Sequence, residues 1–479
     1  MKIALYHGYE LSGSGSNEYT RYLVRTLAEA GHEVLVICRD FTPESYDFVS
    51  RAVGYDQAGE PRELFSRPGR GVTLHQLPPT SIFPVYITDQ QREGHVKAFP
   101  ELTEAELAEY HGAMVAVLKR VLRDERPDVL HCNHLVYQPA VAVEACEETQ
   151  TPFYVVPHGS AIEYTVKKDA RFQELARRGL EASKGVLWIA REVRDRVYGL
   201  FPDLAEAIKA KSQMVGIGTD TSLFRPLSLS ERRGALDELA AQHQPGGKRL
   251  EQREELARTL GAEREVTATR HYWDAYDHKL PDADLPAQLA RLPAEGELLF
   301  FVGAMTYGKG IQSLIAAMPA ILRERPDVHL VLVGSGTYRE VLEALVFALG
   351  SGDEALFAEL VRSGQDLERA TMSGPLEDLL AHVRRPEKRR VRVWRQAARA
   401  GAFLGSSRSR APAAYFSLLS CGGVSLGDQR GVTAGLRRGV GQRCAPHGLL
   451  SLWIARWARR SATPPARRDL AAHVLAGGA

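Results

Sequence analysis

Two glycine-rich segments could bring backbone N–H groups close to an anionic ligand. Gly13 and Gly15 belong to a Ser-Gly-Ser-Gly-Ser run that directly precedes apolar residues at helical spacing. A Gly-Ala-Met-Thr-Tyr-Gly-Lys-Gly run begins at Gly303 and places Lys309 at the start of a second helical pattern. Glycine allows close approach of the backbone, and the first turn of a helix offers unpaired N–H groups to a phosphate. We interpret these four residues as candidate phosphate-binding residues; the alternative in each case is a tight turn.

Neither segment matches a dinucleotide or triphosphate fingerprint in full. Glu18 stands where the third glycine of G-x-G-x-x-G is required, and Gly310 stands where a P-loop has Ser or Thr. The pair Arg39-Asp40 is only a weak candidate for binding a ribose. An NAD-dependent oxidoreductase is therefore the least favoured class of enzyme.

His158 follows a short apolar run that is typical of a buried strand. Ligands of open α/β sheets bind outside the carboxyl ends of the strands, where an imidazole could donate a hydrogen bond to a sugar hydroxyl or a phosphate. We interpret His158 as the candidate catalytic residue, and the alternative is a loop histidine bonded to the backbone. Gly334 and Gly336 end another strand-like run and could allow close approach of a nucleotide.

No pattern in the sequence predicts a bound metal. The five cysteines are scattered without a C-x-x-C pair, which also argues against a disulfide framework. Asp282 and Asp284 resemble an acidic metal-binding pair but lie in a highly charged segment, so we expect a solvated loop. Nearby aromatic residues at helical spacing are expected to pack this segment onto a domain; they are Tyr272, Trp273 and Tyr276.

Apolar runs alternate with helical patterns along most of the chain, which predicts parallel sheets in an α/β fold. The expected strands lie at 2–6, 34–38, 128–131, 153–156, 185–190, 213–217, 298–302 and 330–333. Two separate strand-loop-helix-strand starts predict two Rossmann-like domains that face each other across a cleft. We place these domains at 1–215 and 216–390, with a helical insertion at 227–296.

The segment 391–479 differs in composition from the rest of the chain. Its 14 arginines, no lysine and two aspartates give a net charge of +12, which leaves −10 for residues 1–390. Such an irregular tail is typical of a GC-rich gene translated out of frame or of a disordered segment; a native basic tail that binds RNA or anionic lipid is the alternative. The sequence has no apolar run of about 18 residues and no signal peptide pattern, so a cytoplasmic protein is expected.

Five segments of the chain occur in an order and at a spacing that are specific when taken together. They are the strand, glycine loop and "GHEV" strand at 1–38, "PDVLH" at 127–131, "PHG" at 157–159, "VGIGTDTSLFRP" at 215–226, and the strand-loop pieces at 301–310 and 326–336. Within residues 1–345 the chain resembles family 4 of the retaining glycosyltransferases, which have the B-type fold of two Rossmann-like domains.

The resemblance implies transfer of a sugar, with retention, from a nucleotide-diphosphate sugar to an acceptor. It implies that Lys309 contacts the diphosphate, that His158 contacts the donor sugar or its phosphate, and that Gly13 and Gly15 lie near the phosphates and the acceptor. The nucleotide sugar is the co-substrate, and no metal or other cofactor is expected. The acceptor could be a saccharide, a lipid or a small molecule. Peripheral contact with a membrane is compatible with this interpretation, and no nucleic acid is expected as a partner.

Two departures from the family pattern concern the donor site. Ala304 stands where the family usually has arginine, so half of the expected diphosphate clamp is missing. The family also has two glutamates eight positions apart, whereas no glutamate follows Glu387 in this chain. The resemblance therefore predicts a glycosyltransferase with impaired activity. The alternative is a non-catalytic binding protein that uses the cleft or the basic tail.

Overall fold

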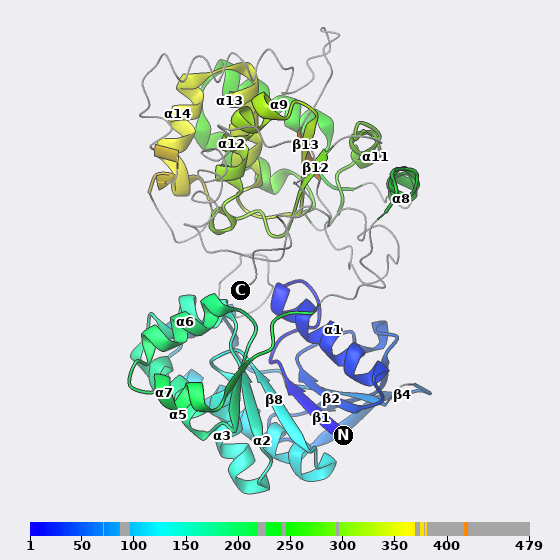
Figure 1. The fold of residues 1–479 in the computed structure, drawn as a ribbon, viewed down its shortest axis with the longest axis vertical. Coiled ribbons are helices and arrows are strands. Elements are labelled where there is room, and N and C mark those ends of the chain that lie inside the picture. The colour runs from blue at the N-terminus through cyan, green and yellow to red at the C-terminus, as the bar shows by residue number, and fades with distance from the viewer. Residues whose placement is uncertain are drawn as a thin grey trace, which may run out of the picture. The chain divides into compact units, whose positions relative to one another are not determined.

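The computed structural model describes residues 1–69, 71–86, 96–218, 227–241, 246–278, 280–293, 297–368, 374–377, 379–380 and 416–419. The chain divides into two compact units, the first spanning Met1–Thr219 and the second beginning at Asp220 (Figure 1). Each unit contains parallel strands flanked by helices, which confirms the predicted α/β class with two Rossmann-like units. Apart from 416–419, the segment 391–479 lies outside the described residues.

The first unit is built on a nine-stranded sheet with the order β11-β10-β9-β8-β1-β2-β5-β3-β4. Its strands are β1 (Lys2–Tyr6), β2 (Glu33–Cys38), β3 (Val49–Tyr55), β4 (Pro61–Ser66), β5 (Val72–Gln76), β8 (Val129–Asn133), β9 (Phe153–Val156), β10 (Gly185–Trp188) and β11 (Ser212–Met214). Neighbouring strands are parallel except for β3 and β4, which are antiparallel. A separate two-stranded sheet joins β6 (Phe83–Val85) to β7 (Val96–Ala98).

Helices cover both faces of this large sheet. They are α1 (Gly15–Glu29), α2 (Glu104–Glu125), α3 (Gln138–Thr149), α4 (Gly159–Ala161), α5 (Ala170–Ala182), α6 (Arg191–Leu200) and α7 (Ala205–Ala210). Leu5 of β1 shares a core cluster with Val24 of α1, whereas Ala4 and Tyr6 share another with residues of α2, α3 and α5. Because successive side chains of a strand point to opposite faces, α1 and the group α2, α3 and α5 lie on opposite sides of β1.

Capping side chains set the starts of two of these helices. Ser14 accepts a hydrogen bond from the backbone N–H of Asn17 and caps α1. Thr103 and Glu106 form a reciprocal capping box at the start of α2. The first helix of the chain therefore begins at Gly15, within the glycine-serine loop that the sequence singles out.

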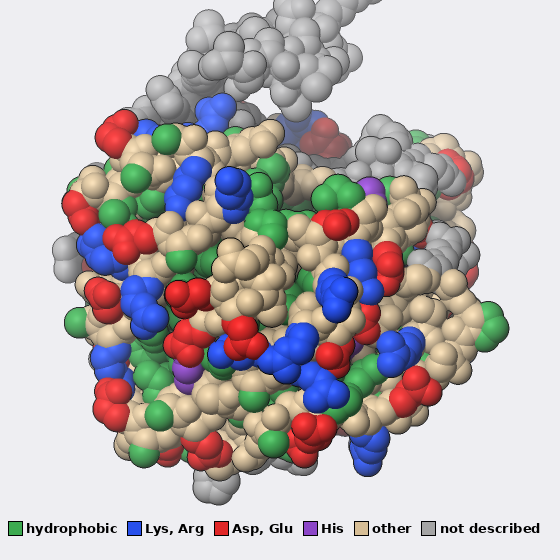
Figure 2. All heavy atoms as spheres, turned by 90° about the horizontal axis from the view of Figure 1, so that it is seen from below, with side chains coloured by type: hydrophobic (Ala, Val, Ile, Leu, Met, Phe, Trp, Pro, Cys, Tyr) green, Lys and Arg blue, Asp and Glu red, His purple; other side chains and the backbone are tan. Residues whose placement is uncertain are grey.

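The surface shown in Figure 2 mixes acidic and basic side chains instead of separating them. Ion pairs also join neighbouring helices of the first unit, since Lys119 and Arg123 of α2 both pair with Glu148 of α3. A protein face that binds nucleic acid usually gathers lysine and arginine into one patch. The described residues of the face in view therefore show no such basic patch.

The second unit has a smaller parallel sheet with the order β12-β13-β14. Its strands are β12 (Glu297–Val302), β13 (Val328–Val333) and β14 (Phe416–Leu419). Its helices are α8 (Leu229–Ala241), α9 (Leu250–Ala262), α10 (Thr269–Tyr272), α11 (Leu285–Ala290), α12 (Ile311–Glu324), α13 (Arg339–Ser351) and α14 (Glu354–Ser363). The register pairs Leu330 of β13 with Phe416, so one piece of the arginine-rich segment adds a strand to this sheet.

The segment predicted as a helical insertion, 227–296, has helices and no strand within its described residues, and it forms part of the core. Leu236 of α8 and Leu289 of α11 pack in one cluster with Val331 and Val333 of β13. Residues of α9 pack with α12 and α13 in a second cluster that holds the alternate residues of β13. The insertion therefore supplies one covering layer of the small sheet.

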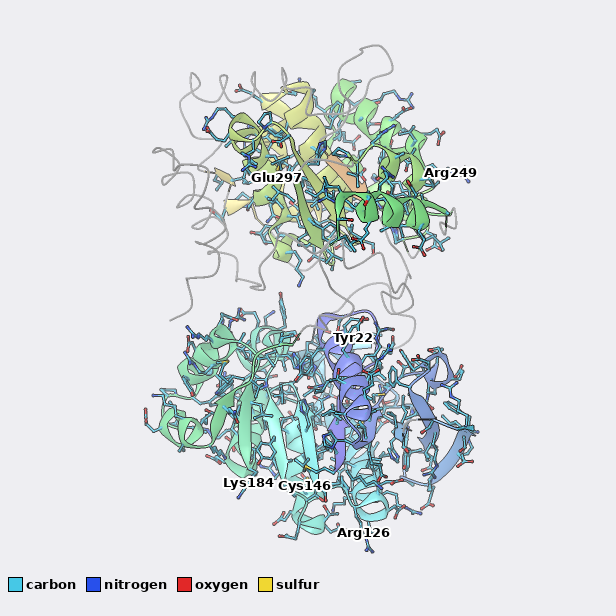
Figure 3. All side chains as sticks on the ribbon, turned by 45° about the vertical axis from the view of Figure 1, so that its right-hand side comes forward. Tyr22, Arg126, Cys146, Lys184, Arg249 and Glu297 are labelled. Carbon is cyan, nitrogen blue, oxygen red and sulfur yellow. The ribbon has the colours of Figure 1, made fainter. Side chains whose placement is uncertain are left out.

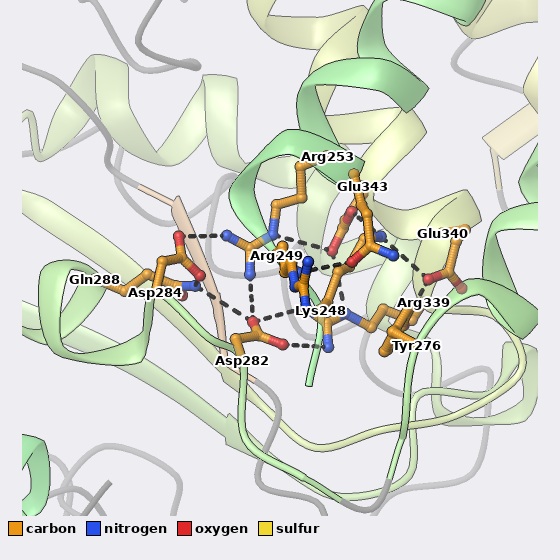
Figure 4. Close-up of polar contacts among 11 residues, drawn as sticks. Lys248, Arg249, Arg253, Tyr276, Asp282, Asp284, Gln288, Arg339, Glu340 and Glu343 are labelled. Carbon is orange, nitrogen blue, oxygen red and sulfur yellow. Dashed lines mark hydrogen bonds and ion pairs between the residues drawn. The ribbon is translucent and has the colours of Figure 1, made fainter. Parts of the chain in front are cut away.

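The expectation of a solvated loop at Asp282 and Asp284 is wrong. Asp282 is fully buried, and its carboxylate accepts hydrogen bonds from Arg339 of α13 at 2.9 and 2.8 Å (Figure 4). Arg253 of α9 bonds to both aspartates. Burial opposes the charge of Arg339, yet the neighbouring carboxylates hold its pKa well above the ordinary value. These acids therefore pair with guanidinium groups of the protein.

The same network extends to a second buried cation. Lys248 is fully buried and its Nζ lies 3.1 Å from Glu340 Oε1 and 2.6 Å from Glu343 Oε2. Tyr276 donates its hydroxyl to Glu340 at 2.6 Å, so this aromatic residue packs as the sequence predicts. We refer to the whole set as the buried charge network; its charged members are Lys248, Arg253, Asp282, Asp284, Arg339, Glu340 and Glu343. It joins the insertion to α13.

Candidate functional site

The order of strands in the first unit creates a topological switch point between β1 and β8. From β1 the chain continues through α1 to β2 on one side, while β8 pairs with the other side of β1 and continues through α3 to β9. Ligands of open α/β sheets bind outside the carboxyl ends of the strands at such a point. Figure 3 labels Arg126 and Lys184, which precede β8 and β10 and mark the opposite, amino edge. The candidate site therefore lies where β1, β8 and β9 end.

Four histidines gather at this carboxyl edge, and we call them the histidine cluster: His7, His131, His134 and His158. His7, His134 and His158 are buried, with at most 7% of their surface exposed. The ring centroids of His134 and His158 are 4.8 Å apart, and those of His7 and His134 are 5.7 Å apart. Neither ring nitrogen of His134 has a hydrogen-bond partner in the described part of the chain. The predicted residue His158 thus belongs to a larger group.

Burial keeps these imidazoles neutral at pH 7. It lowers the pKa of His7 to about 4 and that of His158 to about 3, and neighbouring histidines oppose a second charge. Burial also lowers the pKa of His134 well below its ordinary value. A protonated ring at this place would be removed from water and would have no carboxylate beside it, so the charged form is disfavoured. Each neutral ring then has one N–H donor and one lone-pair acceptor.

Asn133, the last residue of β8, connects these rings. Its Oδ1 lies 2.9 Å from His131 Nε2 and 3.4 Å from His158 Nε2. Its Nδ2 lies 3.0 Å from His7 Nδ1 and 2.6 Å from Thr20 Oγ1 of α1. A side-chain amide has two donor hydrogens and two acceptor lone pairs, so Asn133 uses its full capacity here.

The glycine-serine loop reaches the same edge through the start of α1. Asn17 Oδ1 lies 3.0 Å from His7 Nε2. Gly13 has a φ of +98°, a backbone conformation that favours glycine. A Cβ atom at Gly13 or Gly15 would meet no described atom within 4 Å. The structure therefore brings two predicted features, the loop and His158, to one place, and the space beside the two glycines is open in the described structure.

Sequence reasoning did not single out His7, Asn133 or His134. Each stands at the carboxyl end of a strand that the sequence did predict, and β1 and β8 are parallel neighbours with Tyr6 opposite Cys132. Polar residues at the ends of neighbouring parallel strands were thus the available signal. That signal could be used only with the strand order, which brings together residues more than a hundred positions apart.

In the second unit, Lys309 ends a short 3₁₀ turn, Tyr307–Lys309, directly before α12. Its side chain is exposed and makes no ion pair with any described residue. The N-cap of α12 is Gly310, which has no side chain to bond the N–H groups of the first turn, and its carbonyl accepts from the N–H of Ser313 at 3.1 Å. An exposed cation and the amino end of a helix therefore lie next to each other, an arrangement that favours an anion.

The glycines near Lys309 have a packing role of their own. A Cβ atom at Gly334 would lie 1.9 Å from the carbonyl oxygen of Gly303, and one at Gly336 would lie 2.4 Å from that of Met305. Contacts this short are incompatible with any side chain. The close approach that Gly334 and Gly336 permit in this structure is between the loops after β12 and β13.

Glu368 connects these two loops, and sequence reasoning missed it. Its carboxylate accepts hydrogen bonds from the backbone N–H of Tyr307 at 3.2 Å and from Thr337 Oγ1 at 2.9 Å. Burial raises the pKa of this carboxyl above its ordinary value, although both hydrogen bonds lower it. The loop that carries Lys309 is therefore fixed to the loop after β13.

The weak ribose candidates Arg39 and Asp40 are engaged within the first unit. Asp40 accepts hydrogen bonds from the backbone N–H of Leu11 at 2.9 Å and from the hydroxyl of Tyr46 at 2.7 Å. Arg39 is buried and donates to Thr80 at 2.9 Å. Their polar atoms thus hold the loops around β2 in place.

Within the described residues, no group of three or more His, Cys, Asp and Glu side chains is arranged to hold a metal ion. None of the described helices combines the length and the apolar character that crossing a bilayer requires.

Comparison with known protein families finds a match in each unit. Residues 14–207 match the family described as Glycosyl transferase 4-like domain, and residues 287–367 match Glycosyl transferases group 1. The first range includes Asn133 and His158, and the second includes Lys309 and Glu343. Gly13 lies directly before the first range, and Glu368 lies directly after the second.

Individual relatives are more distant or shorter matches. An uncharacterized glycosyltransferase of Methanocaldococcus jannaschii is 44% identical over 73 residues, which are 15% of this chain and 18% of that protein. An alpha,alpha-trehalose-phosphate synthase (UDP-forming) from Burkholderia vietnamiensis has a TM-score of 0.36 and 14% identity, covering 75% of this chain and 68% of that one. The UDP-GlcNAc 2-epimerase from Neisseria meningitidis bound to UDP-GlcNAc has a TM-score of 0.35 and 10% identity, covering 75% and 70%.

Proposed function

Because this chain belongs to the family 4-like glycosyltransferases, we propose that it transfers a sugar, with retention, from a nucleotide-diphosphate sugar to an acceptor. The acceptor is a hydroxyl-bearing saccharide, lipid or small molecule. The nucleotide sugar is the only co-substrate, and no metal takes part. The observation that carries the donor side of this proposal is the exposed Lys309 beside the N-terminus of α12, within the range that matches the group 1 glycosyltransferases.

The chemistry of the proposed reaction suits the residues of the second unit. Breaking the bond between sugar and diphosphate places negative charge on the leaving group. A lysine and the free N–H groups of a helix start stabilise that charge without having to reorganise. Glu368 keeps the loop of Lys309 against the loop after β13. Lys309 is accordingly the proposed diphosphate ligand.

The first unit supplies the remaining proposed contacts. His158, the candidate catalytic residue, is a neutral imidazole at the carboxyl end of β9. Gly13 and Gly15 leave open space at the start of α1, where an acceptor or a phosphate would fit. Retention is the stereochemistry of the family that the sequence resembles, and NMR of the product's anomeric proton tests it.

Turnover is proposed to be weak relative to donor binding. Ala304 gives the diphosphate clamp no second cation, and no glutamate follows Glu387 to hold the ribose and the donor sugar. A chain that binds a donor but transfers it to no acceptor would instead be a non-catalytic binding protein.

Replacing Lys309 with alanine should weaken binding of UDP-glucose by about 10-fold to 100-fold. A hydrogen bond to a charged group contributes about 1.5–3 kcal/mol, which corresponds to that range of affinity. Titration calorimetry of the full chain with UDP-glucose, and with GDP-mannose as a second probe, measures the change. The effect should be smaller at high salt because an exposed cation is screened.

A matched control is available at the other end of α12. Arg323 is an exposed cation in the last turn of α12, where it pairs with Glu324. Arg323→Ala should leave the affinity for UDP-glucose unchanged. If Lys309→Ala binds UDP-glucose as tightly as the unmodified protein does, Lys309 is not a diphosphate ligand. If Lys309→Ala and Arg323→Ala lose the same affinity, the effect comes from the overall charge of the protein and not from a contact with Lys309.

A further inference from the structure

The position of each proton around His158 can be deduced from two backbone carbonyl groups. Both belong to the glycine-serine loop, at Ser12 and Ser16. A carbonyl oxygen only accepts hydrogen bonds, so each one fixes the direction of the bond that reaches it. From these two fixed ends the donors and acceptors of the network follow one after another.

The first fixed end is the carbonyl of Ser16. Thr20 donates its hydroxyl hydrogen to this oxygen at 2.8 Å. A hydroxyl has one hydrogen, so Thr20 Oγ1 can only accept from Asn133, 2.6 Å away. The amide NH₂ of Asn133 therefore faces Thr20, and its Oδ1 faces the other way.

The second fixed end is the carbonyl of Ser12, which accepts from Nδ2 of Asn17. Oδ1 of Asn17 then faces His7 Nε2 at 3.0 Å, so this nitrogen must carry the ring hydrogen. Because His7 is neutral, its Nδ1 is a lone-pair acceptor, and it receives the second hydrogen of the Asn133 amide at 3.0 Å. Both ends of the network therefore give Asn133 the same orientation.

This orientation determines which nitrogen of His158 carries the hydrogen. Oδ1 of Asn133 has no hydrogen to give, so His158 Nε2, 3.4 Å away, is the donor. His131 Nε2 donates to the same oxygen at 2.9 Å. The Nδ1 atom of a neutral His158 is then unprotonated, and the contact with Asn133 through Nε2 is the hydrogen bond that its ring makes within the described part of the chain.

We propose that Asn133 is a positioning residue that holds His158 as its Nε2–H tautomer, so that Nδ1 accepts a hydrogen bond from a substrate hydroxyl. This assignment of the substrate group rests on the proposed sugar transfer. An unprotonated phosphate oxygen has no hydrogen to give to Nδ1, whereas a sugar hydroxyl has one. His158 therefore complements a hydroxyl, which reverses the donor role that the sequence suggests for it.

The tautomer can be measured on the full chain without any ligand. Long-range ¹H–¹⁵N correlation spectra of protein labelled at histidine distinguish the protonated from the unprotonated ring nitrogen, and the signals lost in His158→Gln identify this residue. We expect the Nε2–H form of His158 to dominate by roughly fivefold to tenfold over the other, which is what a single neutral hydrogen bond contributes. A dominant Nδ1–H form would overturn the proposal.

Two variants separate the role of Asn133 from a general structural effect. Asn133→Ala removes the acceptor oxygen, so the signals of His158 should change to a mixture of both tautomers. Asn133→Asp keeps an oxygen at the same place and should preserve the Nε2–H form, while its buried carboxylate raises the pKa of His158. An unchanged tautomer in Asn133→Ala would overturn the proposal. If that variant does not fold, the unmodified protein and Asn133→Asp still decide it.

A ligand titration then tests the hydroxyl contact. UDP-glucose should shift the Nδ1 signal of His158, whereas UDP at the same saturation should shift it little. Equal shifts with both probes would assign the contact to the nucleotide or its phosphates and would contradict the hydroxyl contact. A protein that shows the expected tautomer but transfers no sugar would contradict the proposed function and leave the role of Asn133 in place.

Discussion

Replacing Asp282 with alanine is expected to destabilise the second unit by about 3–5 kcal/mol, the usual cost of removing one partner from a buried ion pair. The variant leaves Arg339 fully buried and without its two hydrogen bonds at 2.9 and 2.8 Å. Arg253 loses a partner as well. Folded proteins have about 5–15 kcal/mol of stability in total, so this loss should expose much of α13 to solvent exchange.

Hydrogen exchange of the full chain measures this effect locally, which matters because a two-unit protein need not unfold in one step. Amides of α13 should exchange faster in Asp282→Ala, while those of β1 and β8 keep their rates. The control is Asp237→Ala, which breaks an exposed pair with Arg233 on α8 and should cost less than about 1 kcal/mol. Similar exchange of α13 in both variants would show that the buried charge network contributes little.

The buried charge network also explains why the sequence wrongly predicted a solvated loop at Asp282. An acid two positions from another acid, after a proline and among charged residues, is typical of a solvated loop. Its partners Arg253 and Arg339 lie 29 and 57 positions away in the sequence. No local pattern contains that information, because the pairing depends on how α9 and α13 pack. Tyr276 was easier to predict, since an aromatic residue at helical spacing is usually packed.

The strands also differ in whether the local sequence is enough to predict them. Those that form the centre of each sheet, such as β1, β2 and β13, are continuous apolar runs and were predicted within one or two residues. The strands β3 and β4 were not predicted. β4 begins at Pro61 and is mostly exposed, as an edge strand can be, so it has neither an apolar run nor clean alternation. Pairing with β3 gives this segment its structure.

At the candidate site, the residues that could be predicted are those that belong to a recognisable local sequence pattern. Gly13, Gly15 and Lys309 stand in recognisable loops, and His158 follows an apolar strand. Asn133 carries no such signal. Its importance arises from contacts with His7 after β1, His158 after β9 and Thr20 of α1, which only the parallel order of these strands brings together.

Lowering the pH from 7 to 5 is expected to destabilise the first unit by several kcal/mol while the second unit changes little. Burial lowers the pKa of His7 and His75 to about 4 and that of His158 to about 3, from an ordinary value of 6.5. The unfolded chain therefore binds protons between pH 6.5 and 4 that the folded chain does not bind. Their stabilisation is complete above pH 6.5 and is lost as the pH falls, by about 2 kcal/mol per histidine at pH 5.

The second unit serves as an internal reference for this prediction. In this unit the carboxyl of Glu343 is buried, yet its pKa is lowered because Lys248 and Arg339 offset the effect of burial. The stability that this carboxylate contributes is therefore lost only as the pH falls below 4.5, the ordinary pKa of glutamate. Hydrogen exchange, corrected for the pH dependence of the chemical step, should therefore quicken in β1 and β8 before α13. His75→Asn, outside the histidine cluster, should reduce the pH dependence of the first unit by about a fifth, because it removes one of five such groups, the others being His7, His131, His134 and His158. Equal acceleration in both units between pH 7 and 5 would show that these buried histidines do not control the response, since only the first unit contains them.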